Sequence, residues 1–565
     1  MNNTKSIFLY LSCLLFCASL QDLAAQKQKA PYDVYYIGLK DKENTPYSVF
    51  KGNDYLSARA LERRALQGIF LDSLDLPIAP LYIENIEQLG TKVLQRSKWL
   101  NALAVHVTDS NQIAALKALP FVHEVYALGY FRAVKTPREL KRVIRDTMPE
   151  KKSYYGAGEH QAKMLQVPQL HDMGLTGKGI HIAIFDGGFE NAYRMAAFDS
   201  LYANGQILGT KDFVEGDDFV YEDSGHGTDV LSCMGAIMPH RLVGTAPDAQ
   251  YYLFKTEDSK GEYWTEEFSW VAAAEYADSL GVDIINSSLG YTQFNDTAMN
   301  HDYHRDLNGR TTIAARGANI GVNKGLIIAN SAGNEGSRKW HYIGTPADAP
   351  NVLAIAATDA SGAKANFSSV GPGADGLIKP NLAAQGRDAV VASPLGMVVK
   401  MTNGTSFSSP ILAGAIGALR QKFRAVHTLT YKDVLEQTAH QGQVPDSLLG
   451  FGIPQLMHTY MALENETVVF VDEFGNIKTN AKFMQKHIEV LLEKVQDMYI
   501  EISLVNIQLG KELFKQQMPN SLSKNDYLYA IDIPTENLSK GVYALIIRNE
   551  TALNNTLQYI TLIKN

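Results

Sequence analysis

Three short segments of this chain carry the residue types that nucleophilic catalysis needs. Asp186 follows an apolar, β-branched run, His226 lies between two glycines, and Ser406 follows Gly-Thr. A serine hydroxyl is a weak nucleophile at its own pKa, so it needs a base to take its proton and a carboxylate to orient that base. An aspartate, a histidine and a serine in this chain order can fill these roles. We therefore predict acyl transfer through a covalent intermediate on Ser406.

Each of these residues stands at the boundary of a predicted element. Residues 180–185 read as a strand buried on both faces of a parallel sheet, which would place Asp186 at the carboxyl edge. An apolar helical pattern begins after His226, so its imidazole should face a carboxylate on one nitrogen and a hydroxyl on the other. Ser406 opens a second apolar helix, with Pro410 expected in the first turn. A serine at a helix start lies beside free backbone N–H groups.

The oxyanion that forms in such a reaction needs hydrogen-bond donors. Residues 327–336 predict a strand that runs into a glycine-flanked turn carrying Asn334. The side-chain amide of Asn334 and the backbone N–H of Ser406 are the donors that we expect.

The chain resembles the subtilisin-like (subtilase) serine peptidases continuously over residues 155–460, in the family's order. The resemblance implies an α/β fold, with a parallel sheet flanked by helices, and a serine-type endopeptidase that needs no cofactor. The matching motifs are Asp186-Gly187-Gly188, His226-Gly227-Thr228, Asn286-Ser287-Ser288-Leu289-Gly290, Ala332-Gly333-Asn334-Glu335-Gly336, Ala365-Asn366-Phe367-Ser368-Ser369-Val370-Gly371-Pro372 and Gly404-Thr405-Ser406.

The resemblance also implies how substrate binds. One segment would pair with the substrate backbone as an added strand, so the expected substrate is an extended polypeptide. Glu335 would lie at the rim of the pocket, where its carboxylate would tolerate a basic residue before the scissile bond. The residues implied to bind substrate are Ser288, Leu289 and Gly290 in the pairing strand, Ala332 and Gly333 in the pocket wall, and Glu335 at the rim.

A few positions depart from the family's pattern. Asp229 stands three residues after His226, where the family often has a second histidine. Gly187-Gly188 replaces a more usual Thr-Gly or Ser-Gly, and Ser408-Ser409 replaces small or Ala-Thr pairs. None of these changes removes a predicted catalytic group.

The N-terminal part predicts a secreted zymogen. Residues 1–25 read as a signal peptide, with an apolar core and a small-residue cleavage site. Residues 31–130 predict the order β-α-β-β-α-β, the ferredoxin-like split βαβ arrangement, and resemble the inhibitory propeptides of subtilases. The basic segment 131–154 is interpreted as a linker that carries or adjoins the maturation site. An insertion rich in Arg and Leu, residues 47–80, is not explained by the resemblance.

The C-terminal segment, residues 465–565, predicts a small β-sandwich. Its short apolar or alternating stretches are separated by Gly, Asn and Asp. Its ending loosely resembles the sorting domains of Bacteroidetes type IX secretion. A plain accessory β domain is the alternative.

Composition sets limits on compartment and partners. The 565 residues are 45% hydrophobic, which allows several domains, and a net charge of −8 gives no sign of nucleic acid binding. After signal removal Cys233 is the only cysteine, so no internal disulfide can form. No later stretch is apolar enough to span a membrane. We expect a protein that is secreted or at the cell surface, with polypeptide substrates and its own propeptide as partners.

Two further clusters are open to a metal or a structural interpretation. His301 and His304 lack a zinc-site context, so we predict that both lie on the surface. An acidic run could bind calcium, although a solvated loop near the active site is the favoured interpretation. Its members are Asp212, Glu215, Asp217, Asp218, Glu222 and Asp223.

Two other functions are compatible with the sequence. An acyl-enzyme can be resolved by an amine in place of water, which would make a transpeptidase or macrocyclase. The C-terminal β domain could also dominate, with the peptidase unit serving as the scaffold of a surface binding protein.

Overall fold

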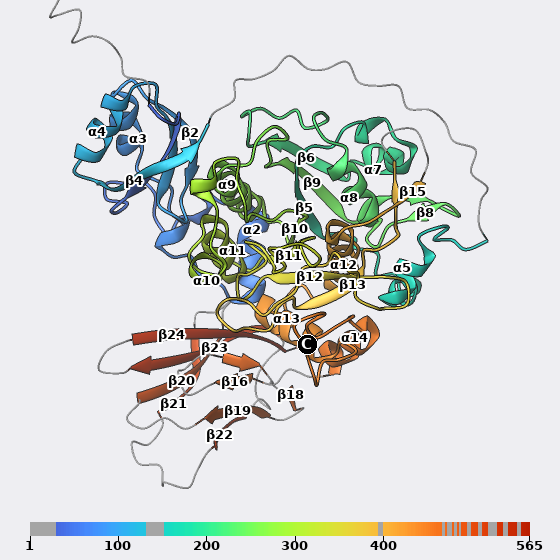
Figure 1. Cartoon of the computed structure of the whole chain (residues 1–565). Helices are drawn as coiled ribbons and strands as arrows, with labels where there is room; N and C mark the ends of the chain where they lie inside the picture. The colour runs from blue at the N-terminus through green and yellow to red at the C-terminus, as the bar shows by residue number, and fades with distance from the viewer. Residues whose placement is uncertain are drawn as a thin grey trace, which may run out of the picture. The chain divides into compact units, whose positions relative to one another are not determined.

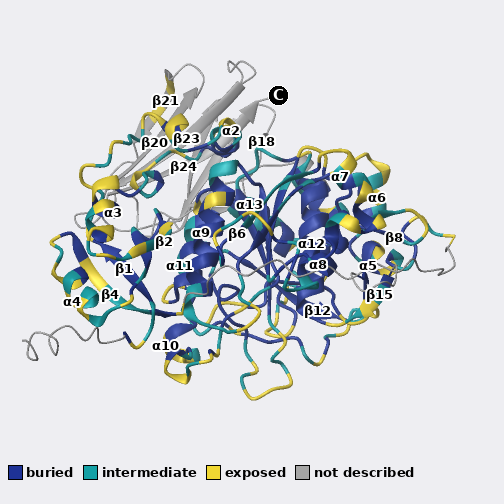
Figure 2. Ribbon diagram, turned by 90° about the horizontal axis from the view of Figure 1, so that it is seen from above, coloured by how far each residue is buried: buried dark blue, intermediate teal, exposed yellow. Residues whose placement is uncertain are grey.

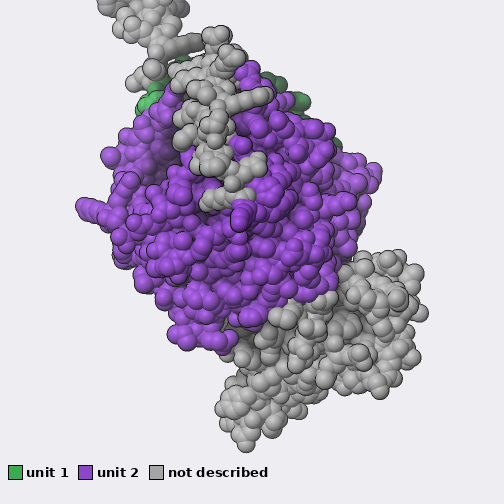
Figure 3. Space-filling model, turned by 90° about the vertical axis from the view of Figure 1, so that its right-hand side faces the viewer, with its two compact units in different colours: residues 1–46, 77–132 green, residues 47–76, 133–565 purple. Residues whose placement is uncertain are grey.

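The computed structural model describes residues 30–130, 152–393 and 399–465, together with the backbone of the strands between 469 and 564. The chain forms two compact units, and the first of these comprises residues 1–46 and 77–132 (Figure 3). The second comprises residues 47–76 and 133–565. The predicted signal peptide and residues 131–151 of the predicted linker lie outside the described residues. Within the described part, no helix is long and apolar enough to cross a membrane.

The first unit contains the β-α-β-β-α-β order predicted from the sequence. Its strands form one antiparallel sheet in the order β2-β3-β1-β4. Ile37, Leu103 and Val105 are fully buried in its core, because alternate residues of a strand point to the same face. The elements are β1 (Val34–Leu39), α3 (Pro80–Glu87), β2 (Lys92–Ser97), β3 (Ala102–His106), α4 (Ser110–Ala118) and β4 (Val122–Gly129).

The core of the second unit is a seven-stranded sheet in the order β13-β12-β11-β10-β5-β9-β6 (Figure 1). The strand pairs from β6 to β13 are all parallel, so their carboxyl ends share one edge. The strands are β5 (His181–Asp186), β6 (Ile207–Asp212), β9 (Gln250–Lys255), β10 (Ile284–Ser287), β11 (Ile327–Ser331), β12 (Leu353–Thr358) and β13 (Leu382–Gln385).

Helices cover both faces of this sheet. On one face α8 (His226–Gly235) packs against α12 (Thr405–Arg420), and on the other α9 (Trp264–Leu280) packs against α11 (Ile313–Asn323). Gly417 of α12 lies so close to the sheet that an added Cβ would come within 3.2 Å of Ile182. Phe185 points to the opposite face and meets Trp270 of α9, with ring centroids 5.6 Å apart. The sheet and the inner faces of these helices are buried (Figure 2), as the unbroken apolar run before Asp186 predicts.

Shorter elements complete the second unit. They are α2 (Ala58–Gln67), α5 (Glu159–Met164), α6 (Val167–Asp172), α7 (Asp199–Ala203), α10 (Tyr303–Asp306), α13 (Thr428–Gln437) and α14 (Leu456–Asn465), with the hairpins β7 (Ile237–Met238) to β8 (Leu242–Val243) and β14 (Ala389–Ala392) to β15 (Val399–Thr402).

The C-terminal segment is β-rich, as expected. Its strands form a five-stranded sheet that contains β19 and a four-stranded sheet in the order β21-β20-β23-β24. The strands are β16 (Val469–Val471), β17 (Ile477–Thr479), β18 (Phe483–Met484), β19 (His487–Glu493), β20 (Tyr499–Asn506), β21 (Lys511–Gln517), β22 (Leu528–Pro534), β23 (Gly541–Glu550) and β24 (Asn555–Lys564).

Candidate active site

The predicted catalytic residues come together at the carboxyl edge of the seven-stranded sheet. Asp186 ends β5, and Ser288 directly follows the neighbouring strand β10. After β9 the chain changes direction across the sheet, because β10, β11, β12 and β13 add on the other side of β5. Ligands of open α/β sheets bind where the strand order reverses in this way. The site therefore lies where the topology alone would place one.

Asp186 and His226 form a direct pair. Nδ1 of His226 lies 2.9 Å from both carboxylate oxygens of Asp186, and Asp186 is only 1% exposed. Because a carboxylate accepts hydrogen bonds, Nδ1 carries the proton and Nε2 is left as an acceptor. Gly227 makes this approach possible, since an added Cβ would lie 2.5 Å from the carbonyl oxygen of Gly188.

The pair sets the charge state of the imidazole. Burial alone would lower the pKa of His226, but the charge of Asp186 and its hydrogen bond outweigh burial, so that the pKa is raised above its ordinary value. The side chain of His226 is 36% exposed, which leaves it open to a substrate. A neutral ring at physiological pH can accept a proton, and a charged ring can be stabilised by Asp186.

Ser406 is the second residue of α12. Its Oγ lies 3.4 Å from the carbonyl oxygen of Ser288, and among the described residues no hydrogen bond joins it to Nε2 of His226. The next residue is Phe407, and its ring centroid lies 5.6 Å from that of the His226 imidazole. Serine–histidine contacts are often long in the absence of substrate and shorten when it binds. The structure thus places Ser406 near the Asp186–His226 pair, without a hydrogen bond between Ser406 and His226.

Pro410 has a different place from the one expected. It is the sixth residue of α12, so it lies in the second turn and not, as predicted, in the first. In a regular helix the N–H at this position would donate to the carbonyl oxygen of Ser406. The hydroxyl of Ser288 donates to this oxygen instead, at 2.9 Å. Because Pro410 has no N–H, the carbonyl oxygen of Ser406 is free to accept this bond. The bond joins the residue after β10 to the start of α12.

Asn334 is oriented by the residue that precedes Ser406. Oδ1 of Asn334 accepts hydrogen bonds from the backbone N–H of Thr405 at 2.9 Å and from its hydroxyl at 3.1 Å. Since the oxygen is held in this way, the Nδ2 donor must point away from Thr405, and within the described residues it has no acceptor. Sequence reasoning selected Asn334 but missed Thr405, which is fully buried.

The predicted substrate-binding segment has an open edge. Ser288 is buried, Leu289 is half-buried and Gly290 is exposed. The carbonyl oxygen of Leu289 is occupied by Nδ2 of Asn330 at 2.9 Å, whereas the N–H and C=O of Gly290 have no partner within the described residues. A free donor and acceptor on an extended segment are what an added strand requires. Within the motif Ser288-Leu289-Gly290, the backbone of Gly290 is therefore open to pair with a substrate, whereas the carbonyl oxygen of Leu289 is not.

The predicted pocket wall follows β11. Ala332 is fully buried and donates its N–H to Ile355 at 3.0 Å. Gly333 has a φ of +105°, and an added Cβ would lie 2.8 Å from Oγ of Ser369, so this turn requires glycine. Its N–H donates to Oγ1 of Thr405 at 3.1 Å.

Glu335 already has a cationic partner. Its Oε1 lies 3.0 Å from Nη1 of Arg338, one turn further along the chain. The Glu335 side chain is 27% exposed and that of Arg338 is 70% exposed, so this pair is solvated and worth little. A basic substrate residue would compete with Arg338 for the carboxylate.

Asp229 is a buried residue of the helix that His226 opens. It lies one turn after His226 in α8 and pairs through Oδ2 with Nζ of Lys400 at 2.6 Å. Burial raises the pKa of Asp229 to about 6, although Lys400 opposes the shift. Its negative charge contributes to the raised pKa of His226. The departure noted in the sequence thus places a carboxyl with a raised pKa one helical turn from His226.

The acidic run is organised around a lysine. Nζ of Lys255, on β9, lies 2.8 Å from Asp212 and 2.7 Å from Asp223. Glu215 is 3.8 Å from the same nitrogen, and Lys255 is 1% exposed. The interpretation as a solvated loop is therefore wrong for Asp212, Glu215 and Glu222, which are buried. The ammonium group of Lys255 thus pairs with the carboxylates of Asp212 and Asp223 inside the unit.

Sequence reasoning missed a second acidic cluster. One carboxylate oxygen from each of Glu257, Glu262 and Glu266 lies within 4.8 Å of the others. Burial raises the pKa of all three carboxyls, to about 7 for Glu262. Glu257 accepts a hydrogen bond of 2.5 Å from the hydroxyl of Tyr291, and it lies beside Gly187. The cluster borders the carboxyl edge, and its spacing along the chain gives no signal of this proximity.

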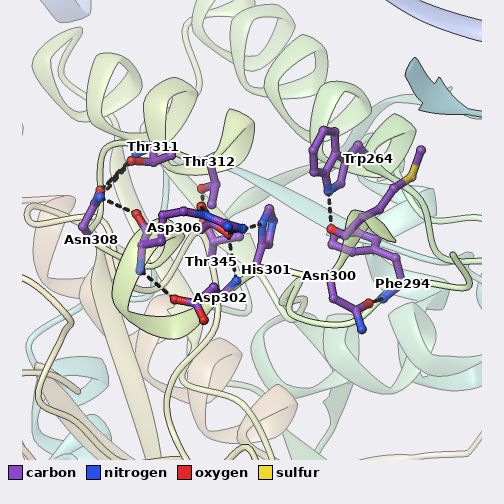
Figure 4. A network of polar contacts seen from close by, with 12 residues as sticks. Trp264, Phe294, Asn300, His301, Asp302, Asp306, Asn308, Thr311, Thr312 and Thr345 are labelled. Atoms are coloured by element: carbon purple, nitrogen blue, oxygen red, sulfur yellow. Dashed lines mark hydrogen bonds and ion pairs between the residues drawn. The ribbon is translucent and has the colours of Figure 1, made fainter. Parts of the chain in front are cut away.

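His301 is buried, not on the surface as predicted. Its Nε2 lies 2.6 Å from Oε1 of Glu267, and its ring stacks on Trp264 at 6.0 Å. Burial lowers the pKa of His301, but the charge of Glu267 outweighs this and raises it. Figure 4 shows His301 within a loop network that also contains Asp306 and links α9 to the segment before α11. His304 is exposed, as predicted.

Parts of this chain are similar to known proteins. Residues 177–452 match the subtilase family, and residues 34–142 match the peptidase S8 propeptide domain of Bacteroidota. Subtilisin NAT of Bacillus subtilis subsp. natto is 28% identical over 358 residues, which cover 63% of this chain and 79% of that protein. Subtilisin of Bacillus pumilus is 29% identical over 279 residues, 49% of this chain and 89% of that protein. The crystal structure of MycP1 without its N-terminal propeptide is similar with a TM-score of 0.42 and 22% identity, and the match covers 53% of this chain and 96% of that one.

Proposed function

Because residues 177–452 belong to the subtilase family of serine-type endopeptidases, we propose that Asp186, His226 and Ser406 are the catalytic triad of this chain. One observation carries the proposal: the Nδ1–carboxylate contact of 2.9 Å leaves Nε2 of His226 as an acceptor, in a ring whose centroid lies 5.6 Å from that of Phe407, the neighbour of Ser406. An unprotonated Nε2 next to a serine at a helix start is the arrangement that general-base catalysis requires.

In this mechanism His226 accepts the proton of the Ser406 hydroxyl while Oγ attacks the substrate carbonyl carbon. Asp186 stabilises the imidazolium that results. His226 then returns the proton to the leaving amine as the peptide bond breaks, and an acyl-enzyme remains. Water, deprotonated by the same ring, completes hydrolysis.

The oxyanion would be bound by Nδ2 of Asn334 and the backbone N–H of Ser406. The two hydrogen bonds from Thr405 support this role, because they fix which end of the Asn334 side chain is a donor. Preorganised donors act on charge that exists only near the transition state. The substrate would be an extended polypeptide segment that pairs with the free edge at Gly290.

The other parts of the chain would serve export and maturation. Residues 1–25 would direct secretion, and the first unit would be a ferredoxin-like inhibitory propeptide whose sheet order, β2-β3-β1-β4, fits that fold. The two sheets of residues 465–565 would pack as a small β-sandwich that acts in sorting to the cell surface. Cleavage in the linker would be made by the peptidase itself.

The test is to express the full chain and its Ser406→Ala variant side by side and to determine mass and N-terminal sequence. We expect the wild type to be cut in the linker and the variant to stay uncut. A fluorophosphonate probe should label the wild type alone. If the variant is cut equally, or if the probe labels neither protein, the catalytic assignment fails. A product with a new peptide bond would indicate aminolysis of the acyl-enzyme.

A further inference from the structure

The insertion that the resemblance to subtilase propeptides leaves unexplained lies within the Bacteroidota propeptide match, and most of it is part of the second unit. The chain leaves the first unit after Pro46 and returns to it at Pro77, and residues 47–76 between these points belong to the second unit (Figure 3). We call residues 47–76 the anchor segment. Its helix, α2, buries Ala60, Arg63, Arg64 and Gln67. A helix that buries mainly polar groups needs specific partners for them.

Those partners are supplied by the end of α9. Arg63 and Arg64 are each 1% exposed, and they contact the two carboxylate oxygens of Asp278 at 2.5 Å and 2.6 Å. Asp278 is completely buried. Arg63 also donates to the backbone carbonyl oxygens of Val282 and Lys324. One carboxylate of the peptidase is thus shared by two guanidinium groups of the anchor segment.

The anchor segment also caps α9. That helix has no basic residue in its own last turn, although cations stabilise a helix C-terminus. The N–H of Ser57 donates to the carbonyl oxygen of Ser279 at 2.9 Å, and Nε of Arg59 donates to that of Gly281 at 3.0 Å. Gly281 has a φ of +81°, and an added Cβ would lie 2.7 Å from the backbone N of Ala60. The helix end is therefore shaped for close approach of the anchor segment.

A second set of contacts surrounds the first. Nζ of Lys324, just after α11, lies 2.9 Å from Asp75 and 2.7 Å from Asp72 of the anchor segment. Asp75 also pairs with Arg64 at 2.8 Å. Gln67 donates to the carbonyl oxygen of Gly325 at 3.0 Å and accepts from the hydroxyl of Thr428 at 2.8 Å. Charges alternate across this contact, so each buried ion has a partner of opposite sign.

We propose that the anchor segment is a binding element that holds the N-terminal domain on the peptidase after the linker has been cut. The end of α9, with Asp278 and the carbonyl groups of residues 279–282, is the site that it recognises. Because the anchor segment is joined at both ends to the first unit, cleavage between residues 131 and 154 leaves that unit attached. Release then requires dissociation of the anchor segment or a further cut beside it. This inference rests on the proposed maturation of the zymogen.

The test uses the full chain with Ser406→Ala and a recognition sequence for a sequence-specific protease inserted within residues 131–151. After the cut, size-exclusion chromatography at physiological salt should show the N-terminal fragment eluting with the peptidase. Elution of that fragment by itself would overturn the proposal. Because the added protease makes the cut, this result does not depend on whether Ser406 is the nucleophile.

Variants within α2 decide whether the anchor segment is responsible. Arg63→Met keeps much of the apolar stem but leaves part of the buried polar network unpaired, so the fragment should dissociate about 100-fold faster or more. Glu62→Gln is the matched control on the exposed side of the same helix. The side chain of Glu62 is 56% exposed, and its ion pair with Arg424 is long at 3.7 Å. It should change the rate by no more than about twofold. Equal rates for the two variants would overturn the proposal.

A milder variant covers the case in which Arg63→Met does not fold. Gln67→Leu removes the bonds to Gly325 and Thr428 but leaves the ion pairs in place. It should accelerate dissociation about tenfold, since each lost bond leaves a buried polar atom unpaired. A rate equal to that of Glu62→Gln would contradict the role of the anchor segment.

Discussion

Replacing Thr405 by valine should slow turnover modestly, whereas replacing Asn334 by alanine should slow it far more. In Thr405→Val the Oγ1 bond of 3.1 Å to Oδ1 of Asn334 is lost, as is the bond that Oγ1 accepts from the N–H of Gly333, but the backbone N–H bond of 2.9 Å to Asn334 remains. A neutral hydrogen bond contributes about 0.5–1.5 kcal/mol, which corresponds to a decrease of about 2- to 13-fold in kcat. Asn334 stays, less well oriented.

Asn334→Ala removes the donor itself. The expected decrease in kcat is about 100- to 1000-fold, a range taken over from the oxyanion-hole asparagine of a subtilisin. KM should change little in either variant, because the oxyanion exists only near the transition state. Thr405→Ser keeps the hydroxyl and is the matched control, with kcat close to that of the wild type.

The assay is steady-state hydrolysis of a fluorogenic peptide by the matured enzyme, with active sites titrated so that kcat refers to competent protein. The reasoning is refuted if Asn334→Ala and Thr405→Val lose equal activity, since Thr405 orients Asn334 and does not itself supply a donor to the oxyanion. It is also refuted if the loss in Asn334→Ala lies in KM. A low kcat in Thr405→Ser would show that packing at this site, and not the hydroxyl, is what matters.

Three further predictions follow from the charges and burial around the site. Asp229→Asn removes a negative charge that helps to raise the pKa of His226, so the acid limb of the pH profile of kcat/KM should move to lower pH; a limb that is unmoved or moves up contradicts this. Burial raises the pKa of Glu262 to about 7, so the folded carboxyl keeps a proton that the unfolded chain loses above its pKa of about 4.3, and stability falls as pH rises between these values. Urea unfolding should therefore show Glu262→Gln more stable than wild type by about 1–2 kcal/mol near pH 8, after allowance for partial exposure, and equal to it near pH 4; equal stability at both would count against it. Cys233 is fully buried, and burial raises the pKa of its thiol, so a thiol reagent should label it only at the rate of unfolding, and rapid labelling of folded protein would argue otherwise.

Local signals in the sequence were sufficient for the elements that carry the candidate site. The apolar run that ends at Asp186 forms a strand, and His226 and Ser406 each open a helix. The order of elements in the first unit was predicted in full, because strand and helix periodicities differ and each short element shows one of them. Gly227 lies where a side chain would block the Asp186–His226 pair, and its place next to the histidine was visible in the motif.

Only the tertiary structure decided which charges meet. Lys255 pairs with carboxylates of the acidic run, and Asp278 pairs with two arginines of the anchor segment. His301 is buried against Glu267. Each of these pairs joins elements far apart in the chain, and sequence periodicity describes one element at a time. A charged residue also looks the same in a sequence whether water or a partner solvates it. The sequence by itself determined the local elements and the chemistry at their ends, and packing determined which polar groups were removed from water together.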